Sequence, residues 1–211
     1  MNELKKINQL VSKEVDARLD VFFDRKIDEA KKIDPIYAKL LEDMKKFILR
    51  GGKRLRPTLM LIGYKAAGGK NDKLALDASV ALELFHNFVL IHDDVMDGDL
   101  KRYGGANITG IYDRRFAKQL KPAAARHTAE SIAILAGELN EFFTFEVLTE
   151  LKPAAECEKI EYPKPDGTRH SLREVKATLQ SSPIFIRSDI DTQVWRIADD
   201  LVCVCVCVCV C

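Results

Sequence analysis

Apolar residues recur about every 3.6 positions along the first 150 residues of the chain, which is the spacing of amphipathic α-helices. A first predicted helix contains the apolar residues Leu10, Val11, Val15, Leu19, Val21, Phe22 and Phe23. A second helix follows Pro35, ends at Gly51-Gly52 and contains Tyr37, Leu40, Leu41, Met44, Phe47 and Ile48. Charged residues lie between these positions, so each helix has one face for a core and one for solvent.

Further helices are predicted up to residue 150, and we therefore expect an all-α fold. They cover residues 58 to about 67, 74 to about 96, and 127 to 148. The middle one of these is the most apolar. In the last one, the small residues Ala133, Ala136 and Gly137 would allow close helix packing. Glu130 and Glu138 are expected at the surface, with a role in supporting the site residues as the alternative.

The segment GGKRLRP, residues 51–57, joins the second and third predicted helices. Its two glycines let the backbone approach a ligand closely, and Lys53, Arg54 and Arg56 place three cations within four residues. A helix N-terminus flanked by Lys and Arg suits an anion, and Arg can bind phosphate through two hydrogen bonds. The alternative is an ordinary helix end with a few basic surface residues, and this motif alone does not choose between them.

Three aspartates end the most apolar helix, in the stretch ALELFHNFVLIHDDVMDGDLKRYGG, residues 81–105. In a helix, Asp93 and Asp97 lie about 6 Å apart along the axis and share a face with His86. Such carboxylates repel each other, but magnesium is held by one or two carboxylates plus substrate phosphates. A solvated acidic turn is the alternative. The apolar run 88–91 before the aspartates favours the polar mouth of a buried helix, and hence a metal site.

The composition excludes several classes of protein. Apolar residues make up 47% of the 211 residues, which excludes a disordered chain and suffices for one domain with a sizeable core. The 33 basic and 32 acidic residues nearly balance, so no nucleic-acid partner is expected. We expect no membrane span, because no apolar stretch is expected to be long enough to cross a membrane. The N-terminus lacks the apolar core of a signal peptide. We therefore predict a cytoplasmic protein.

The basic segment and the aspartates together indicate a substrate that carries diphosphate, bound by cations on one side and through metal on the other. GGKRLRP, LELFHNFVLIHDDVMD with the following KRYGG, and ILAGE resemble the motifs of the trans-prenyl diphosphate synthases, the polyprenyl synthetase family. The resemblance covers about residues 33–148. The combination of motifs is specific, although no single one is.

The resemblance implies an isoprenoid-synthase-type helical bundle, incomplete in this chain, around a deep apolar cavity. Members of the family join isopentenyl diphosphate to an allylic diphosphate. Mg²⁺ between two aspartate-rich motifs neutralises the charge that develops as pyrophosphate leaves. The double bond of isopentenyl diphosphate then attacks the allylic cation, and a proton is lost. The resemblance also implies a homodimer for an intact protein.

The positions of the family's substrate ligands can be assigned residue by residue. Lys53, Arg56 and His86 match its isopentenyl diphosphate ligands. Arg102 matches the first of two paired arginines, the one that contacts the allylic diphosphate. The second of the pair is Tyr103 in this chain, which departs from the family pattern.

The aspartates and one aromatic residue complete the implied site. Asp93 and Asp97 match the magnesium ligands, and Asp94 belongs to the same catalytic motif. Phe88 stands five residues before Asp93, where a bulky residue limits chain growth in this family. This implies a product of farnesyl or geranylgeranyl length. Core packing is the alternative role for Phe88, and both roles are compatible.

The family-like pattern stops near Glu150, so we predict a partial prenyl synthase domain over residues 1–150 and an irregular, non-family tail over 151–211. VWRIADDLV, residues 194–202, weakly resembles the second aspartate-rich motif and is interpreted as a chance match. From Val202 to Cys211 Val and Cys alternate, without the spacing of a zinc site. A translated two-nucleotide repeat yields such an alternation. We hypothesise a truncated, frameshifted or misjoined reading frame, and a chain whose activity is lost or impaired.

Two other functions fit parts of the sequence. A non-catalytic subunit of a heteromeric prenyl synthase would explain the loss of the second motif, whereas the intact first motif argues against it. A terpene cyclase of the same fold shares the DDxxD motif. GGKRLRP disfavours a cyclase, because cyclases do not bind isopentenyl diphosphate.

Overall fold

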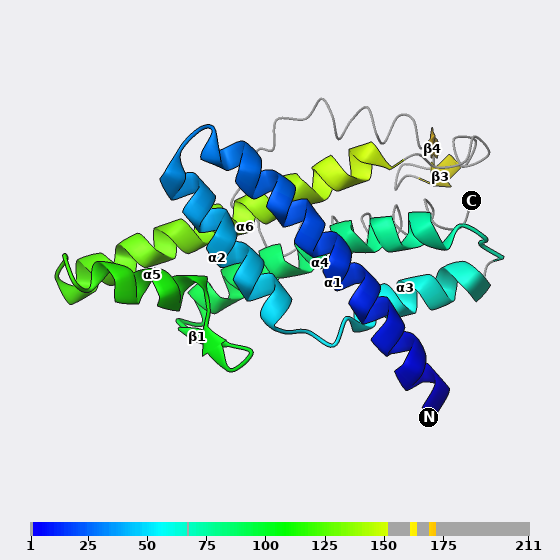
Figure 1. Cartoon of the computed structure of the whole chain (residues 1–211), viewed down its shortest axis with the longest axis horizontal. Coiled ribbons are helices and arrows are strands. Elements are labelled where there is room, and N and C mark those ends of the chain that lie inside the picture. The colour runs from blue at the N-terminus through cyan, green and yellow to red at the C-terminus, as the bar shows by residue number, and fades with distance from the viewer. Residues whose placement is uncertain (1, 67, 152–160, 164–168, 172–211) are drawn as a thin grey trace.

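The computed structural model describes residues 2–66, 68–151, 161–163 and 169–171. The described helices are α1 (Asn2–Lys31), α2 (Pro35–Arg50), α3 (Leu55–Ala66), α4 (Asp72–Met96), α5 (Ile108–Phe116) and α6 (Pro122–Glu150) (Figure 1). Strands β1 (Lys101–Arg102) and β2 (Gly105–Ala106) form a small antiparallel hairpin, and β3 (Glu161–Pro163) pairs with β4 (Arg169–Ser171). The all-α fold class is confirmed, with helix α5 and these short strands as additions that the apolar pattern did not predict.

Most of the predicted tail, residues 151–211, lies outside the described residues. This includes the Val-Cys repeat and the Asp199-Asp200 pair. The predicted domain boundary at residue 150 therefore stays a prediction.

Local sequence explains where the helices begin. Asp34 caps α2, since its Oδ1 accepts hydrogen bonds from the backbone N–H groups of residues 36 and 37 at 2.6 and 3.2 Å, and Pro35 occupies the first helical position. Helix α3 begins at Leu55, three residues before the predicted start, because Pro57 is compatible with the first turn of a helix. Helix α6 begins at Pro122, five residues early, and continues through alanines, which are strong helix formers.

Helix α4 lies at the centre of the described bundle. It packs against α6 on one side and against α3 and α1, while α1 and α2 pack against each other and cross in front of it (Figure 1). The largest fully buried side chains come from these helices and include Leu19, Phe23, Phe47, Leu84 and Ile91. One core therefore joins α1, α2 and α4.

Small residues allow α6 to lie close to α4, as predicted. Ala133 and Ala136 are completely buried, and a side chain at Gly137 would overlap the His92 imidazole of α4. Thr144 Oγ1 lies 3.5 Å from the Ala81 carbonyl oxygen across the same contact. The prediction of close packing is confirmed.

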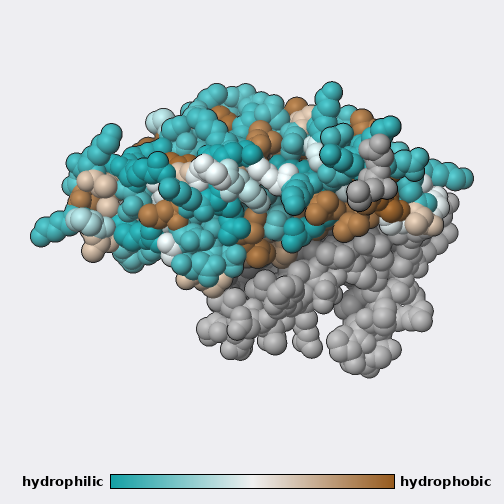
Figure 2. Space-filling view, turned by 90° about the horizontal axis from the view of Figure 1, so that it is seen from below, coloured by the Kyte–Doolittle hydropathy of each residue, from teal (hydrophilic) through white to brown (hydrophobic). Residues whose placement is uncertain are grey.

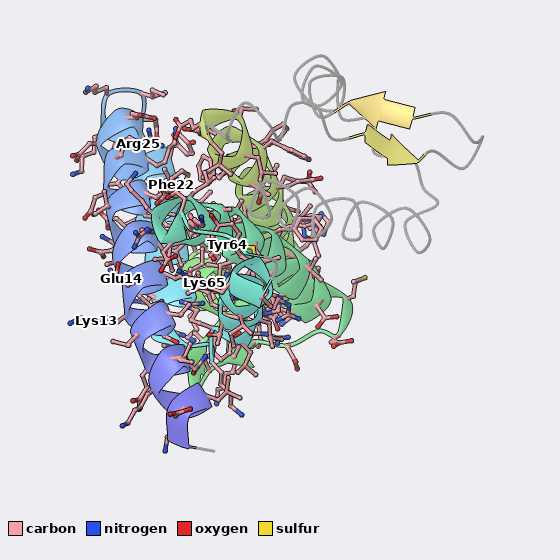
Figure 3. All side chains as sticks on the ribbon, turned by 90° about the vertical axis from the view of Figure 1, so that its right-hand side faces the viewer. Lys13, Glu14, Phe22, Arg25, Tyr64 and Lys65 are labelled. Atoms are coloured by element: carbon pink, nitrogen blue, oxygen red, sulfur yellow. The ribbon has the colours of Figure 1, made fainter. Side chains whose placement is uncertain are left out.

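The two faces of α1 differ as its periodicity predicts. In Figure 3, Lys13 and Glu14 extend away from the bundle, whereas Phe22 turns towards it. The Phe22 ring meets Phe143 of α6 edge-on at 5.4 Å between centroids, and the Arg25 guanidinium lies 5.5 Å from the Phe22 centroid. Helix α1 is thus anchored to α6 as well as to α2.

Helix α4 is long and apolar enough to cross a membrane by length and composition alone. The prediction that no stretch reaches that length is therefore wrong. Most of its most apolar stretch is buried within the bundle, as in the core helix of a soluble protein, so this finding is weak evidence for a span. Figure 2 shows a face on which hydrophilic residues predominate, with smaller hydrophobic groups between them.

Candidate functional site

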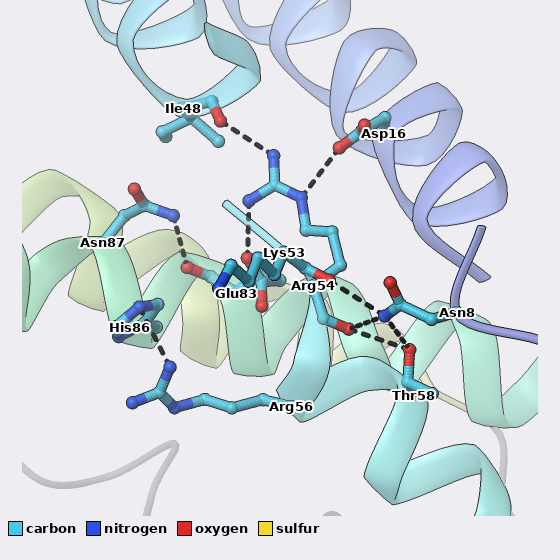
Figure 4. Close-up of polar contacts among 10 residues, drawn as sticks. All are labelled: Asn8, Asp16, Ile48, Lys53, Arg54, Arg56, Thr58, Glu83, His86 and Asn87. Atoms are coloured by element: carbon cyan, nitrogen blue, oxygen red, sulfur yellow. Dashed lines mark hydrogen bonds and ion pairs between the residues drawn. The ribbon is translucent and has the colours of Figure 1, made fainter. Parts of the chain in front are cut away.

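Arg54 is the buried centre of the basic segment, which we define as residues 51–57. Its side chain is 3% exposed and bonds to three elements (Figure 4). Nε lies 2.8 Å from Asp16 Oδ1 of α1, Nη1 lies 2.6 Å from Glu83 Oε2 of α4, and Nη2 donates to the Ile48 carbonyl oxygen of α2 at 2.7 Å. Burial raises the pKa of Glu83, and the Arg54 charge opposes that rise. Of the three predicted cations, Arg54 is therefore structural.

Lys53 and Arg56 are exposed on either side of this buried arginine. Within the described part of the chain, neither forms an ion pair with a carboxylate. Arg56 belongs to the first turn of α3, and its Nη1 lies 3.0 Å from His86 Nε2 (Figure 4). The structure thus brings Arg56 and His86 together, as the resemblance implies, although they are 30 residues apart.

The environment of His86 keeps its ring neutral. The pKa of His86 is lowered from 6.5 to about 4, first by burial and then by the charges of Arg56, Arg54 and Arg102. A guanidinium can only donate, so Nε2 accepts the bond from Arg56, and Nδ1 carries the proton. The influence of Arg102 also shows that the region after α4 lies near the basic segment.

The aspartate segment, residues 93–102, contains its own cation. Arg102 Nε lies 2.7 Å from Asp94 Oδ1, and Nη2 lies 3.5 Å from Asp93 Oδ2. The Asp94 side chain is 2% exposed. Burial raises the pKa of Asp94, and the hydrogen bond and charge of Arg102 oppose that rise. Asp94 therefore holds Arg102 against the end of α4.

Asp93 and Asp97 are the more accessible carboxylates of the aspartate segment. The Asp93 side chain is 47% exposed, and Asp97 is exposed as the C-cap of α4, with its N–H bonded to the Asp93 carbonyl oxygen at 2.8 Å. Among the described residues, no three His, Cys, Asp or Glu side chains form a group that could hold a metal ion. Two accessible carboxylates still fit Mg²⁺, which takes one or two carboxylates plus substrate phosphates.

The β1–β2 hairpin brings the aspartate segment into contact with the basic segment. Its turn residues Tyr103 and Gly104 have φ angles of 53° and 72°, as a two-residue type I′ turn requires. A side chain at Gly51 would overlap the Tyr103 ring, so backbone and ring are packed together. Arg50 Nη1 also donates to the Ala106 carbonyl oxygen at 2.7 Å. Tyr103, which the resemblance places where the family has its second arginine, thus serves here as a packing residue.

Phe88 lies on α4, five residues before Asp93, and is partly buried. Its ring centroid is 5.5 Å from that of Phe85 and 4.8 Å from that of His92. His92 in turn approaches Glu138 of α6, with 3.4 Å between Nε2 and Oε1. Glu138 is therefore partly buried at the α4–α6 contact rather than fully exposed at the surface. The role of Phe88 in product length stays a prediction.

Sequence reasoning missed the residues that hold the basic segment. Asn8 and Asp16 of α1 and Glu83 of α4 all bond to it. Glu83 gave the clearest available signal, because it is an acid in the apolar stretch just before His86, and a buried acid requires a partner. Asn8 and Asp16 stand among other polar residues of α1, so nothing in the local pattern distinguishes them.

Residues 38–162, more than half of the chain, match the family model for polyprenyl synthetase. The chain belongs to the polyprenyl synthetase family. The predicted family resemblance is confirmed, and α1 precedes the residues that match this family.

Relatives within the polyprenyl synthetase family include short-chain enzymes. The chain is 34% identical over 124 residues to a short chain isoprenyl diphosphate synthase of Methanocaldococcus jannaschii, and 39% identical over 102 residues to a geranylgeranyl diphosphate synthase of Methanosarcina mazei. These matches cover 58% and 48% of this chain but only 32% and 26% of the relatives. The chain therefore spans no more than a third of their length.

A solved structure of the family supports the predicted fold. It is the geranylgeranyl pyrophosphate synthase of Corynebacterium glutamicum complexed with isoprenyl diphosphate and magnesium. The similarity has a TM-score of 0.62 and 26% sequence identity, and it covers 73% of this chain and 43% of that chain. The isoprenoid-synthase-type helical fold is confirmed.

Proposed function

We propose that this chain supplies the isopentenyl diphosphate site and the first aspartate-rich motif of a short-chain trans-prenyltransferase. The enzyme would join isopentenyl diphosphate to an allylic diphosphate. One observation carries the proposal: Arg56 and the neutral His86 meet at 3.0 Å beside a loop whose backbone is fixed by the buried Arg54. Exposed cations on such a loop suit a diphosphate.

The proposed ligands for isopentenyl diphosphate are Lys53, Arg56 and His86. Arg56 uses one N–H to bind His86 Nε2, which leaves other guanidinium N–H groups for phosphate oxygens. The proton on His86 Nδ1 gives the imidazole one donor without adding a charge. Lys53 adds a mobile point charge from the same loop. Together they would hold the diphosphate end, while the apolar end of the substrate is left to the helical core.

The aspartate segment would bind the allylic diphosphate. Asp93 and Asp97 are the proposed Mg²⁺ ligands, and the bound ion would neutralise charge on the departing pyrophosphate. Arg102 is the proposed direct ligand. Its contact with Asp93 is long, at 3.5 Å, so a phosphate oxygen can compete for Nη2 while the 2.7 Å bond to Asp94 keeps the guanidinium in place.

Product length, assembly and turnover belong to the same proposal. Phe88 is the proposed limit on chain growth, which corresponds to a farnesyl or geranylgeranyl product. An intact protein is expected to be a homodimer in the cytoplasm. We expect the 211-residue chain alone to bind isopentenyl diphosphate with little or no turnover, because its sequence lacks a clear second aspartate-rich motif.

The test uses the purified chain with Mg²⁺, labelled isopentenyl diphosphate and an allylic diphosphate, with binding and prenyl products measured separately. Binding without product is the expected result, and it also fits a non-catalytic subunit. Product that disappears in Asp93→Ala would show that the chain turns over by itself. Absence of binding to isopentenyl diphosphate would contradict the proposed function.

A further inference from the structure

Helix α1 contacts the basic segment although it lies before the residues that match the family. Asn8 Nδ2 lies 2.9 Å from the Lys53 carbonyl oxygen and 2.8 Å from Thr58 Oγ1 (Figure 4). The Arg54 carbonyl oxygen lies further away, at 3.4 Å. The amide has two hydrogens, so it can satisfy the two short contacts at once. One side chain of α1 thus joins the loop to the first turn of α3.

Asp16 forms a second connection from the same helix. Its Oδ1 lies 2.8 Å from Arg54 Nε. Asp16 follows Asn8 by about two turns of α1. Asn8 therefore binds the backbone of the basic segment, and Asp16 binds its buried side chain. The two contacts fix the segment at separate points.

The basic segment needs such external contacts because its backbone is strained. Gly52 has a φ angle of 115°, and Arg54, which has a side chain, has a φ angle of 45°. A non-glycine residue in that region is unfavourable and persists only where surrounding structure holds it. Lys53 lies between these two residues, and Arg56 follows two residues later. A relaxed backbone would therefore change where both exposed cations point.

We infer that Asn8 and Asp16 are positioning residues for the isopentenyl diphosphate site, and that α1 is a functional part of that site. They touch no substrate in this scheme. They act through the backbone of Lys53 and the side chain of Arg54, which set the directions of the Lys53 and Arg56 side chains. This inference rests on the proposed function, because it assumes that these two cations bind the diphosphate.

The experiment compares Asn8→Asp and Asp16→Asn with a matched control in the full chain. Asn8→Asp keeps the shape of the side chain but replaces a donor by a carboxylate facing a carbonyl oxygen. Asp20→Asn is the control, because Asp20 lies on the same helix and pairs with Lys45 of α2 at 2.8 Å, away from the basic segment. Melting temperature is measured for each variant, so that lost stability is separated from lost binding.

Two readouts are used, namely isopentenyl diphosphate affinity by calorimetry and amide hydrogen exchange of residues 51–57. We expect Asn8→Asp to weaken affinity about tenfold and Asp16→Asn about threefold, with Asp20→Asn near wild type. Exchange in residues 51–57 should rise in the first two variants only, which a general loss of stability would not produce.

Each outcome decides a different point. The positioning role of α1 would be overturned if the wild-type chain binds and Asn8→Asp binds as tightly as Asp20→Asn. Unchanged amide exchange of residues 51–57 in Asn8→Asp would also overturn it. A wild-type chain that does not bind isopentenyl diphosphate would contradict the proposed function, and the inference would fail with it. Weaker binding together with faster local exchange in Asn8→Asp supports the inference.

Discussion

The basic segment and the aspartate segment hold their charged residues in opposite ways. In the basic segment, Arg54 is buried in bonds to three helices, and Lys53 and Arg56 remain exposed. In the aspartate segment, the cation Arg102 is already occupied by Asp94 and Asp93. The first region is thus prepared to receive an anion without rearrangement. Under the proposed function, the second would exchange the Asp93–Arg102 contact for its ligand, which would couple binding of the metal to binding of the diphosphate.

Removing the buried cation should have the largest effect on stability. Arg54→Met leaves Glu83, whose side chain is 3% exposed, without its partner, and we expect the free energy of unfolding to fall by about 3–5 kcal/mol. Urea denaturation measures this loss. The double variant Arg54→Met/Glu83→Leu should recover much of it, because no buried charge then remains. Equal losses in the single and double variants would contradict a buried ion pair as the cause.

Removing the cation of the aspartate segment should cost less. Arg102→Ala leaves the buried Asp94 carboxylate without its ion pair, at an expected cost of about 1–3 kcal/mol. The pKa of Asp94 is already raised in the folded chain, and it should rise further without Arg102. When a carboxyl group has a higher pKa in the folded than in the unfolded state, the protein loses stability as the pH rises through the folded pKa. The difference in unfolding free energy between Arg102→Ala and wild type, measured by urea denaturation, should therefore grow with pH. A difference that does not change with pH would count against this account.

Breaking the contact between the two segments should have a smaller effect. Tyr103→Ala removes the ring that packs on Gly51 and lies 6.2 Å from the Phe47 ring, so we expect a loss of about 1 kcal/mol in unfolding free energy. Tyr103→Phe is the control and should match wild type, since the ring makes the contact. A loss in Tyr103→Phe as large as in Tyr103→Ala would show that the hydroxyl, not the packing, matters.

The smallest expected effect concerns the pKa of His86, which reports the distance between the segments. NMR titration of the free chain should place this pKa at about 4, and Arg102→Ala should raise it slightly, because a nearby positive charge that disfavours the imidazolium is removed. The lowered pKa also means that stability falls as the pH drops from 6.5 towards 4. If the pKa of His86 does not change in Arg102→Ala, the two segments lie too far apart for Arg102 to influence His86.

The sequence predicted the long helices well because their apolar periodicity is regular, but it missed the short helix α5, and several of the predicted helices start earlier in the structure. It also placed Arg56 with His86 through the resemblance. It could not tell which of the three cations of the basic segment would be buried, since Arg54 and Arg56 look alike in the sequence. The partners Asn8, Asp16 and Glu83 arise from helix packing between distant positions, which periodicity does not encode.

The most direct test of the diphosphate site is the affinity of the full chain for isopentenyl diphosphate, measured by calorimetry in wild type, Arg56→Gln and Arg25→Gln. Arg25 is the matched control, because it pairs with Glu146 and Glu150 at the end of α6 and makes no bond to the basic segment among the contacts of the described residues. We expect wild type and Arg25→Gln to bind alike, and Arg56→Gln to bind about 10- to 100-fold more weakly through the loss of charge-assisted hydrogen bonds. Equal affinity in all three proteins would contradict the central claim.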